Sequence, residues 1–190
     1  MLSIKENITN ELIINKSKFI TKLIKINNEN DVKDNLNKIK IEYSNATHYC
    51  YGYIINNQNK ASDDGEPSGT AGLPILNVLK QNNLDYLLCI VIRYFGGIKL
   101  GTGGLVRAYT NSVVEALKKS EIIELQKGKL IVIQFNYDLV KNIDYLLKDS
   151  RIINKEFKEK ITYEVILNNQ TFAELTKHNI DFEIKEEIFI

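Results

Sequence analysis

The hydrophobic and polar positions along the chain follow helical spacing in some segments and strand-like runs in others. Apolar residues at positions 32, 36 and 39 recur at helical spacing, so residues 30–43 are expected to form a helix with Asn28 or Asn30 as its N-cap. Residues 84–95 form a nearly continuous apolar run that is typical of a strand buried on both faces. The pattern predicts strands over 17–26, 47–55 and 84–95, and helices over 30–43, 73–80 and 105–120.

Two further segments belong to this first half of the chain. The residues up to Lys16 precede the first of these strands closely enough to pair with it as a hairpin. Residues 56–72 are mostly polar and contain glycine and proline, so they are expected to form a long loop. The first half of the chain is therefore expected to mix strands and helices within one domain.

The character of the sequence changes near residues 124–129. Beyond this point the pattern predicts strand, helix, strand, strand, helix and strand, which is the ferredoxin-like order of elements. We therefore expect an α+β protein with an N-terminal domain over 1–125 and a C-terminal domain over 126–190. In the second domain the predicted strands are 129–135, 151–157, 160–167 and 182–190, and the predicted helices are 137–149 and 171–179.

Composition and charge narrow the range of functions. The formal net charge is +1, which lacks the strongly basic balance of a dedicated nucleic-acid-binding domain, so any such contact would come from a local patch. No apolar run approaches the roughly 18 residues needed to span a bilayer, and the first residues contain no apolar signal core. The two cysteines lack metal-binding spacing. These features favour a reduced, cytoplasmic protein without a membrane segment.

The segment over residues 93–110 is unusually rich in glycine and in positive charge. It holds five of the ten glycines and no acidic residue. Glycine lets another group approach the backbone closely, and the helix expected to follow presents free N–H groups and the positive end of its dipole. We expect this segment to attract an anion, with one of its cations, Arg107, in the first helical turn. The glycines are Gly96, Gly97, Gly101, Gly103 and Gly104, and the cations are Arg93, Lys99 and Arg107.

Two interpretations of this segment are open at the level of sequence. It fits neither a Rossmann GxGxxG motif nor a P-loop, because the third small residue of the one and the lysine of the other are missing. An outside anion or partner could bind here, or the acidic loop that carries Asp63, Asp64 and Glu66 could fold against it and neutralise it. Ser68 and Thr70 could donate to an anion or cap the helix over 73–80.

His48 and Cys50 are weaker candidates for chemistry. They are two residues apart on a predicted strand and therefore share a face, so a Cys–His nucleophile pair is conceivable. No third member of such a site is identifiable, and a structural cysteine is the more ordinary use of that position. His48 with the loop carboxylates could also bind a metal, although loop carboxylates are usually solvated. We therefore assign no catalytic residue, metal or cofactor.

Four sequence blocks match the motifs of a known protein family in their order and spacing. They are SKFI (17–20), ATHYCY (46–51), SDDGEPSGTAGLPIL (62–76) and VIRYFGGIKLGTGGLVRAY (91–109). With these blocks the chain resembles the IMPACT/YigZ family over most of residues 15–120. The resemblance implies a two-layer N-terminal α/β domain like the second domain of small-subunit ribosomal protein five. It also implies a ferredoxin-like C-terminal domain similar to the last domain of elongation factor G. Eukaryotic relatives in this family act as regulators of translational control by binding a protein partner.

Two functions from different classes fit the sequence. The favoured one is a non-enzymatic binding or regulatory protein linked to translation, which contacts RNA, the ribosome or a protein of the translation machinery. The alternative is an enzyme or sensor for a phosphorylated small molecule, with the glycine-rich segment as its phosphate site and Asp64 or Glu66 as base or metal ligand. Both use the same candidate residues, namely Asp63, Asp64, Glu66, Ser68, Thr70, Arg93, Gly96, Gly97, Lys99, Gly101, Gly103, Gly104 and Arg107, with His48 as a possible addition.

Overall fold

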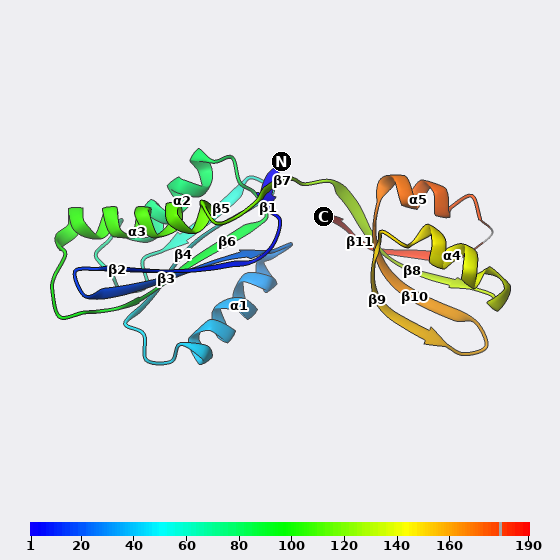
Figure 1. Cartoon of the computed structure of the whole chain (residues 1–190), viewed down its shortest axis with the longest axis horizontal. Helices are drawn as coiled ribbons and strands as arrows, with labels where there is room; N and C mark the ends of the chain where they lie inside the picture. The colour runs from blue at the N-terminus through cyan, green and yellow to red at the C-terminus, as the bar shows by residue number, and fades with distance from the viewer. Residues whose placement is uncertain (179) are drawn as a thin grey trace. The chain divides into compact units, whose positions relative to one another are not determined.

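The computed structural model describes residues 1–178 and 180–190, and the chain forms two compact units (Figure 1). Unit 1 comprises Met1–Glu124 and unit 2 comprises Leu125–Ile190. Each unit has its own sheet and its own buried apolar cluster. The two units are therefore described separately. No helix among the described residues is long and apolar enough to cross a membrane.

Unit 1 is built on a five-stranded antiparallel sheet with the order β2-β3-β6-β4-β5. The central strand, β6, is buried at seven of its eight positions, as its apolar run predicts. A separate two-stranded sheet joins β1 (Leu2–Ile4) to β7 (Ile122–Glu124). The five strands are β2 (Ile8–Ile14), β3 (Ser17–Lys25), β4 (His48–Ile55), β5 (Gln58–Ser62) and β6 (Leu87–Tyr94).

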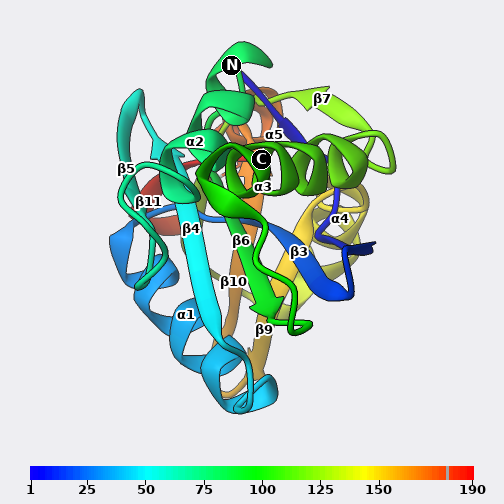
Figure 2. The same cartoon turned by 90° about the vertical axis from the view of Figure 1, so that its left-hand side faces the viewer.

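Helices cover both faces of this sheet, as Figures 1 and 2 show. Helices α2 (Gly72–Gln81) and α3 (Gly101–Leu117) pack on one face, and α1 (Glu29–Glu42) packs on the other. Alternate residues of β6 enter the two apolar clusters, Leu87 and Cys89 on one side and Leu88 and Ile90 on the other. Unit 1 therefore has three layers, and the prediction of two layers was wrong, because a central strand that is apolar on both faces needs a helix on each.

The element boundaries confirm most of the pattern in the first half. The predicted hairpin is formed by β2 and β3, whose two-residue turn, Asn15-Lys16, has positive φ at both residues. Asn28 caps α1 and shares a reciprocal capping box with Asp31. The predicted loop over 56–72 proved wrong in part, because residues 58–62 form β5 along the edge of β4.

Helix α3 begins four residues before the predicted start. Three of the segment's glycines, Gly101, Gly103 and Gly104, therefore lie in its first turn rather than in a loop. Glycine is a poor helix former, so the local propensity argued against this start. Arg107 consequently lies in the second turn, which corrects its predicted place in the first.

Unit 2 has the predicted element order βαββαβ, arranged as an antiparallel sheet with the strand order β11-β8-β10-β9. Helices α4 and α5 supply Ile143 and Leu175 to the core on one face of that sheet. The predicted helix over 171–179 ends at Leu175, and its last predicted residue lies outside the described residues. The elements are β8 (Lys127–Phe135), a 3-10 turn (Tyr137–Leu139), α4 (Val140–Leu146), β9 (Arg151–Phe157), β10 (Ile161–Asn168), α5 (Asn169–Leu175) and β11 (Asp181–Phe189).

Burial on both faces of β6 makes a testable difference between two isoleucines. Ile90 is fully buried in β6, whereas Ile13 on the edge strand β2 is 67% exposed. Ile90→Ala should lower the free energy of unfolding by about 3 kcal/mol, because it removes buried methyl groups and leaves a cavity. Ile13→Ala should cost less than about 1 kcal/mol. Urea denaturation of the two variants checks this, and equal losses would contradict the three-layer packing.

Candidate functional site

The acidic loop and the glycine-rich segment meet in a buried ion pair. The side chains of Arg93 and Glu66 are only 5% and 3% exposed, and Arg93 Nη1 donates to Glu66 Oε1 at 2.5 Å. The Tyr109 hydroxyl donates to the same oxygen at 2.8 Å from α3. Thus one carboxylate oxygen joins the loop, the end of β6 and a helix. The sequence left open whether the two segments pair with each other, and the structure shows that they do so through Arg93.

The guanidinium of Arg93 is enclosed by other side chains. The rings of Phe19 and Phe95 have their centroids 5.5 and 5.6 Å from its central carbon, so the cation is close to two aromatic rings. Its Nη2 lies 3.4 Å from the hydroxyl oxygen of Ser17. Among the described residues, its Nε has no hydrogen-bond partner. Arg93 is therefore an internal cation of unit 1.

Asp63 fixes the path of the acidic loop. Its carboxylate accepts backbone N–H groups from Gly69 at 2.8 Å, Ala71 at 3.0 Å and Gly72 at 2.8 Å. Burial opposes ionisation of this group, but the three N–H donors outweigh it and hold the pKa of Asp63 below its usual 3.8. Because the Gly72 N–H belongs to the first residue of α2, Asp63 also satisfies the start of that helix.

Ser68 and Thr70 do not have the predicted capping role. No side chain of the N-cap residue caps α2, and the Thr70 hydroxyl instead donates to the Pro67 carbonyl at 2.6 Å. Ser68 is exposed on the outside of the loop. The capping prediction was therefore wrong, because Asp63, five residues before the predicted positions begin, reaches the free N–H groups first.

Asp64 and His48 hold the other side of the loop. The Asp64 carboxylate accepts the Tyr49 backbone N–H at 2.7 Å. The His48 Nδ1 lies 2.9 Å from the Asp64 carbonyl oxygen, and since a carbonyl only accepts, this ring nitrogen is the donor. His48 Nε2 is 3.9 Å from Glu66. The interactions of His48 therefore tie the loop to β4.

Cys50 is a structural thiol. It is fully buried, and its sulfur donates to the Asp63 carbonyl oxygen at 2.9 Å. Burial raises the pKa of Cys50 to about 12, so the reactive thiolate is disfavoured. In the part of the chain that the structure describes, no group of three or more His, Cys, Asp or Glu side chains is arranged to hold a metal ion.

The glycines of the segment lie in two different environments, one tightly packed and one open. Gly96 packs against the backbone of Lys16 and Ser17 in the β2–β3 turn, where any Cβ would collide with main-chain atoms. Its N–H donates to the Ser17 hydroxyl at 3.2 Å. In contrast, Gly101 and Gly103 have no atom within 4 Å of where a Cβ would lie. Gly97 also faces open space, at a positive φ of 85°.

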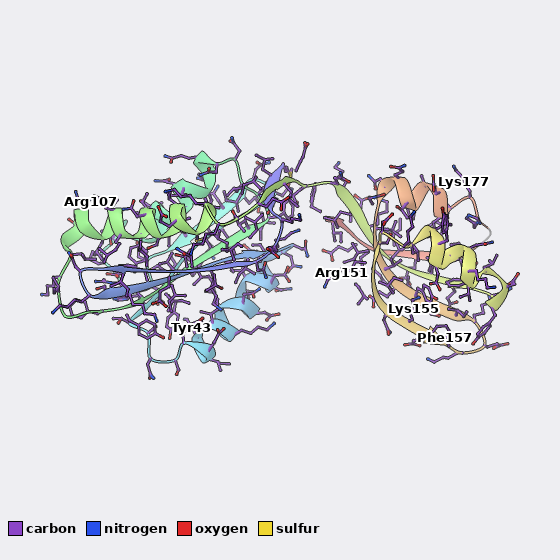
Figure 3. All side chains as sticks on the ribbon, viewed as in Figure 1. Tyr43, Arg107, Arg151, Lys155, Phe157 and Lys177 are labelled. Atoms are coloured by element: carbon purple, nitrogen blue, oxygen red, sulfur yellow. The ribbon has the colours of Figure 1, made fainter. Side chains whose placement is uncertain are left out.

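Two of the three predicted cations face solvent. Lys99 and Arg107 are exposed, and neither takes part in an ion pair with any other described residue. Arg107 lies on α3 at the side away from the sheet (Figure 3). Helix α3 has no side-chain cap and no acidic residue in its first turn. The exposed part of the segment therefore presents uncompensated positive charge.

A groove of about 390 Å³ opens between the acidic loop and the start of α3. It brings together four of the predicted site residues, and the remaining lining is mainly apolar. Thr70, Arg107 and His48 do not line it. The lining residues are Glu66, Pro67, Arg93, Phe95, Lys99, Leu100, Gly101, Thr102 and Leu105. We call this hollow the α3 groove.

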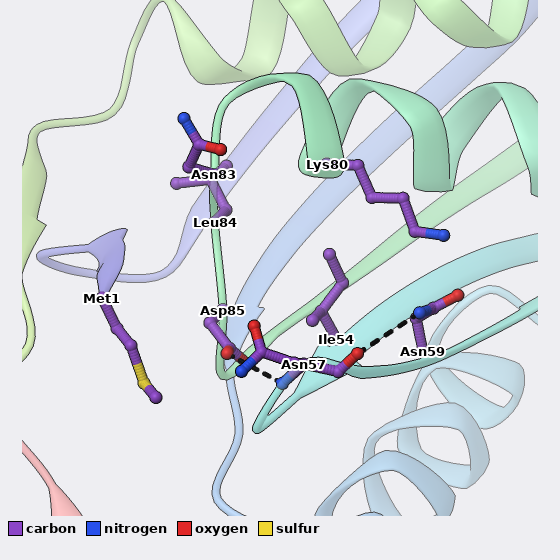
Figure 4. Close-up of a pocket in the computed structure, with 8 residues that line it drawn as sticks. All are labelled: Met1, Ile54, Asn57, Asn59, Lys80, Asn83, Leu84 and Asp85. Carbon is purple, nitrogen blue, oxygen red and sulfur yellow. Dashed lines mark hydrogen bonds between the residues drawn. The ribbon is translucent and has the colours of Figure 1, made fainter.

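A second hollow of about 270 Å³ contains none of the predicted site residues (Figure 4). Within it, the buried Asp85 carboxylate accepts the Asn57 backbone N–H at 3.0 Å and so holds the β4–β5 turn. Its lining residues are Met1, Ile54, Asn57, Asn59, Lys80, Asn83, Leu84 and Asp85.

Sequence reasoning missed three residues that shape the site. Tyr109 and Ser17 supply hydroxyl groups to the buried ion pair, and Phe95 covers Arg93. Ser17 opens the SKFI block, and Tyr109 closes the long glycine-rich block. Their presence in these blocks was a signal that they act with Arg93, although no pattern along the chain links positions 17, 66, 93 and 109.

The fold and the site define the class of protein: it is an α+β protein of two units, with a groove in unit 1 that is lined by a buried ion pair. The sequence profile of the Impact N-terminal domain matches residues 15–117. The chain is 39% identical to the IMPACT family member YvyE of Bacillus subtilis over 173 residues, which is 88% of this chain and 80% of that protein. It is 34% identical to the IMPACT family member YigZ of Escherichia coli, covering 89% and 86%. The chain therefore belongs to the IMPACT family.

A solved structure has a fold similar to that of this chain. A crystal structure described only as that of a hypothetical protein superimposes with a TM-score of 0.62, at 30% sequence identity and over 97% of both chains.

The lowered pKa of Asp63 predicts a defined pH response. A carboxyl group whose pKa is lower in the folded state than in the unfolded chain stabilises the fold at any pH above its unfolded-state pKa. That stabilisation is lost as the pH falls through the folded-state pKa. At pH 7, Asp63→Asn should lower the free energy of unfolding by about 1 to 2 kcal/mol, because the amide nitrogen cannot accept N–H groups. The difference from the parent protein should shrink as the pH falls below 3.8. Urea denaturation across pH 7 to 3 measures it, and a constant difference would contradict this role.

The buried ion pair predicts strong coupling between its partners. Arg93→Met alone should destabilise the protein by about 3 kcal/mol, because Glu66 would remain buried without its counter-charge. Adding Glu66→Gln should recover part of that loss, with a coupling energy of about 2 kcal/mol in a double-mutant cycle. Additive losses in denaturation experiments would mean that the two side chains act independently.

Proposed function

We propose that this protein is a non-enzymatic regulatory binding protein linked to translation, which contacts its partner through the exposed part of the glycine-rich segment and the adjoining acidic loop. The observation that carries the proposal is the contrast between the charges of the site. The carboxylates of Asp63, Asp64 and Glu66 are all engaged within unit 1. Lys99 and Arg107 remain exposed and are paired with no described residue. Such a surface suits binding rather than catalysis.

The link to translation rests on the family. Eukaryotic relatives regulate translational control through a protein partner, as the resemblance implies, and this chain shares the blocks that form the site. The same reasoning supports two finer fold assignments as proposals: a domain over 1–125 like the second domain of small-subunit ribosomal protein five, and a ferredoxin-like domain over 126–190. The strand order β11-β8-β10-β9 supports the second assignment.

The open face of the sheet in unit 2 argues against RNA binding at that surface. Ile131, Ile133 and Val165 face the helices, so the alternate residues of the strands face away from them. Those residues include no aromatic side chain for base stacking and more acidic than basic groups. In three cross-strand rows they are Asp181, Gln134, Thr162 and Glu156, then Glu183, Val132, Glu164 and Asn154, then Glu186, Leu130, Ile166 and Arg151.

The alternative, an enzyme or sensor for a phosphorylated small molecule, receives support from one feature only. The uncapped start of α3 beside Lys99 suits an anion. A catalytic role is less well supported, because Asp64 accepts a backbone N–H and Glu66 is paired with Arg93. Glu66 is therefore not free to act as the base or metal ligand that this alternative requires, and Asp64 already ties the loop to β4.

Co-sedimentation with purified bacterial ribosomes tests the proposed function. We expect the protein to pellet with ribosomes that retain their bound translation factors, at 50 mM salt. The double variant Lys99→Glu/Arg107→Glu should reduce the pelleted fraction at least fivefold, because both side chains are exposed. Lys119→Glu, at an exposed lysine just beyond the other end of α3, is the control. Absence of pelleting in every arm, or equal loss in the control, would contradict the proposal.

A further inference from the structure

We infer that the α3 groove binds a short segment of a protein partner in which an acidic side chain stands beside an apolar one. The inference rests on the proposed function and names the chemistry of the partner at the same site. It follows from three properties of the groove: its apolar wall, its uncompensated positive charge and its size.

The apolar side chains that line the groove form a wall that is partly exposed to solvent. Phe95, which lines the groove, is 47% exposed, and Ile98, the residue before Lys99 in the chain, is 43% exposed. Leu100 and Pro67 add further apolar surface to the lining. A group of large apolar side chains at the rim of a groove is typical of a surface that a partner covers. The wall therefore selects a partner that brings an apolar side chain.

Positive charge gathers at one end of this wall. Lys99 lines the groove and is paired with no described residue. The first N–H groups of α3 have no side-chain acceptor, and the space around Gly101 and Gly103 is open. Arg93, 5% exposed, lines the same groove, and its Nε lacks a partner among the described residues. A carboxylate would be attracted to this end.

The negative charge of Glu66 does not oppose such a ligand. Its carboxylate accepts from both Arg93 and Tyr109, so its charge is compensated within the fold. The acidic loop thus forms a wall of the groove without repelling an incoming anion.

The size and charge of the groove favour a protein segment over RNA. A volume of about 390 Å³ accommodates a few side chains. A nucleic acid strand is held mainly by several cations along its phosphates, whereas Lys99 is the one exposed cation of the lining and the whole chain carries a net charge of only +1. An apolar side chain next to one carboxylate matches both halves of the groove.

A random 12-residue peptide library displayed on phage identifies the preferred chemistry directly, because such a library is biased toward no particular partner. Selection on the full-length protein should enrich Asp or Glu within two positions of Phe, Leu or Ile. Selection on Lys99→Glu should not enrich them. The enriched peptide is then synthesised, and its affinity is measured by fluorescence polarisation beside a copy with its acids changed to Lys and beside single-stranded RNA.

Two substitutions test the anchoring of the carboxylate. Lys99→Glu should weaken the synthetic peptide at least tenfold. Gly103→Glu places a carboxylate over the free N–H groups of α3, so it should also weaken the peptide at least tenfold, while the melting temperature stays the same or rises. Gly103→Gln has a similar size without the charge and should bind at least fivefold more tightly than Gly103→Glu. Lys119→Glu should bind as the parent protein does.

The outcomes separate this inference from the proposed function. Enrichment of basic or purely apolar peptides, no enrichment at all, or tighter binding of the RNA would overturn the inference. So would acidic peptides whose affinity ignores Lys99→Glu. If ribosome co-sedimentation still depends on Lys99 and Arg107 in that case, the proposed function stands and only the partner's chemistry is wrong. If co-sedimentation fails as well, both are wrong.

Discussion

A guanidinium buried at the end of the central strand is the constraint on which the rest of unit 1 depends. A charge in that position without a partner would cost several kcal/mol, so Arg93 needs a counter-charge within reach. Glu66 supplies it, and in doing so holds the acidic loop against the end of β6. Tyr109 donates to the same oxygen and fixes α3 against the loop. The walls of the α3 groove are set by this arrangement.

The same constraint divides the glycine-rich segment into two parts with different roles, although glycines and positive charges occur in both. Arg93 and Gly96 belong to the interior, the one through its ion pair and the other through its contact with the β2–β3 turn. Lys99 and Arg107 belong to the surface, where their charges meet no acidic residue among those described. The interior half holds the loops in place, and the surface half is left to interact with something outside the chain.

Periodicity predicted the elements that bury an apolar stripe. The spacing of Val32, Leu36 and Ile39 predicted α1, and the alternation in unit 2 predicted its βαββαβ order. It failed where tertiary contacts override local preference. The polar residues of β5 form a strand only because β4 lies beside them, and the glycines that open α3 have low helix propensity. The ion pair was only half predictable, since charge suggested partners but nothing along the chain related the hydroxyls of Ser17 and Tyr109 to it.

The strand order of unit 1 also governs how this protein is made. Strand β6 lies in the middle of the sheet, yet it is the last of the five to be synthesised. The hairpins β2–β3 and β4–β5 leave the ribosome with unpaired inner edges, and only β6 can join them. Until then each nascent hairpin offers an edge to which other chains can pair. The sheet is thus completed in a single step, when β6 joins the two hairpins. A chain on a ribosome that stalls before residue 94 cannot complete the sheet of unit 1.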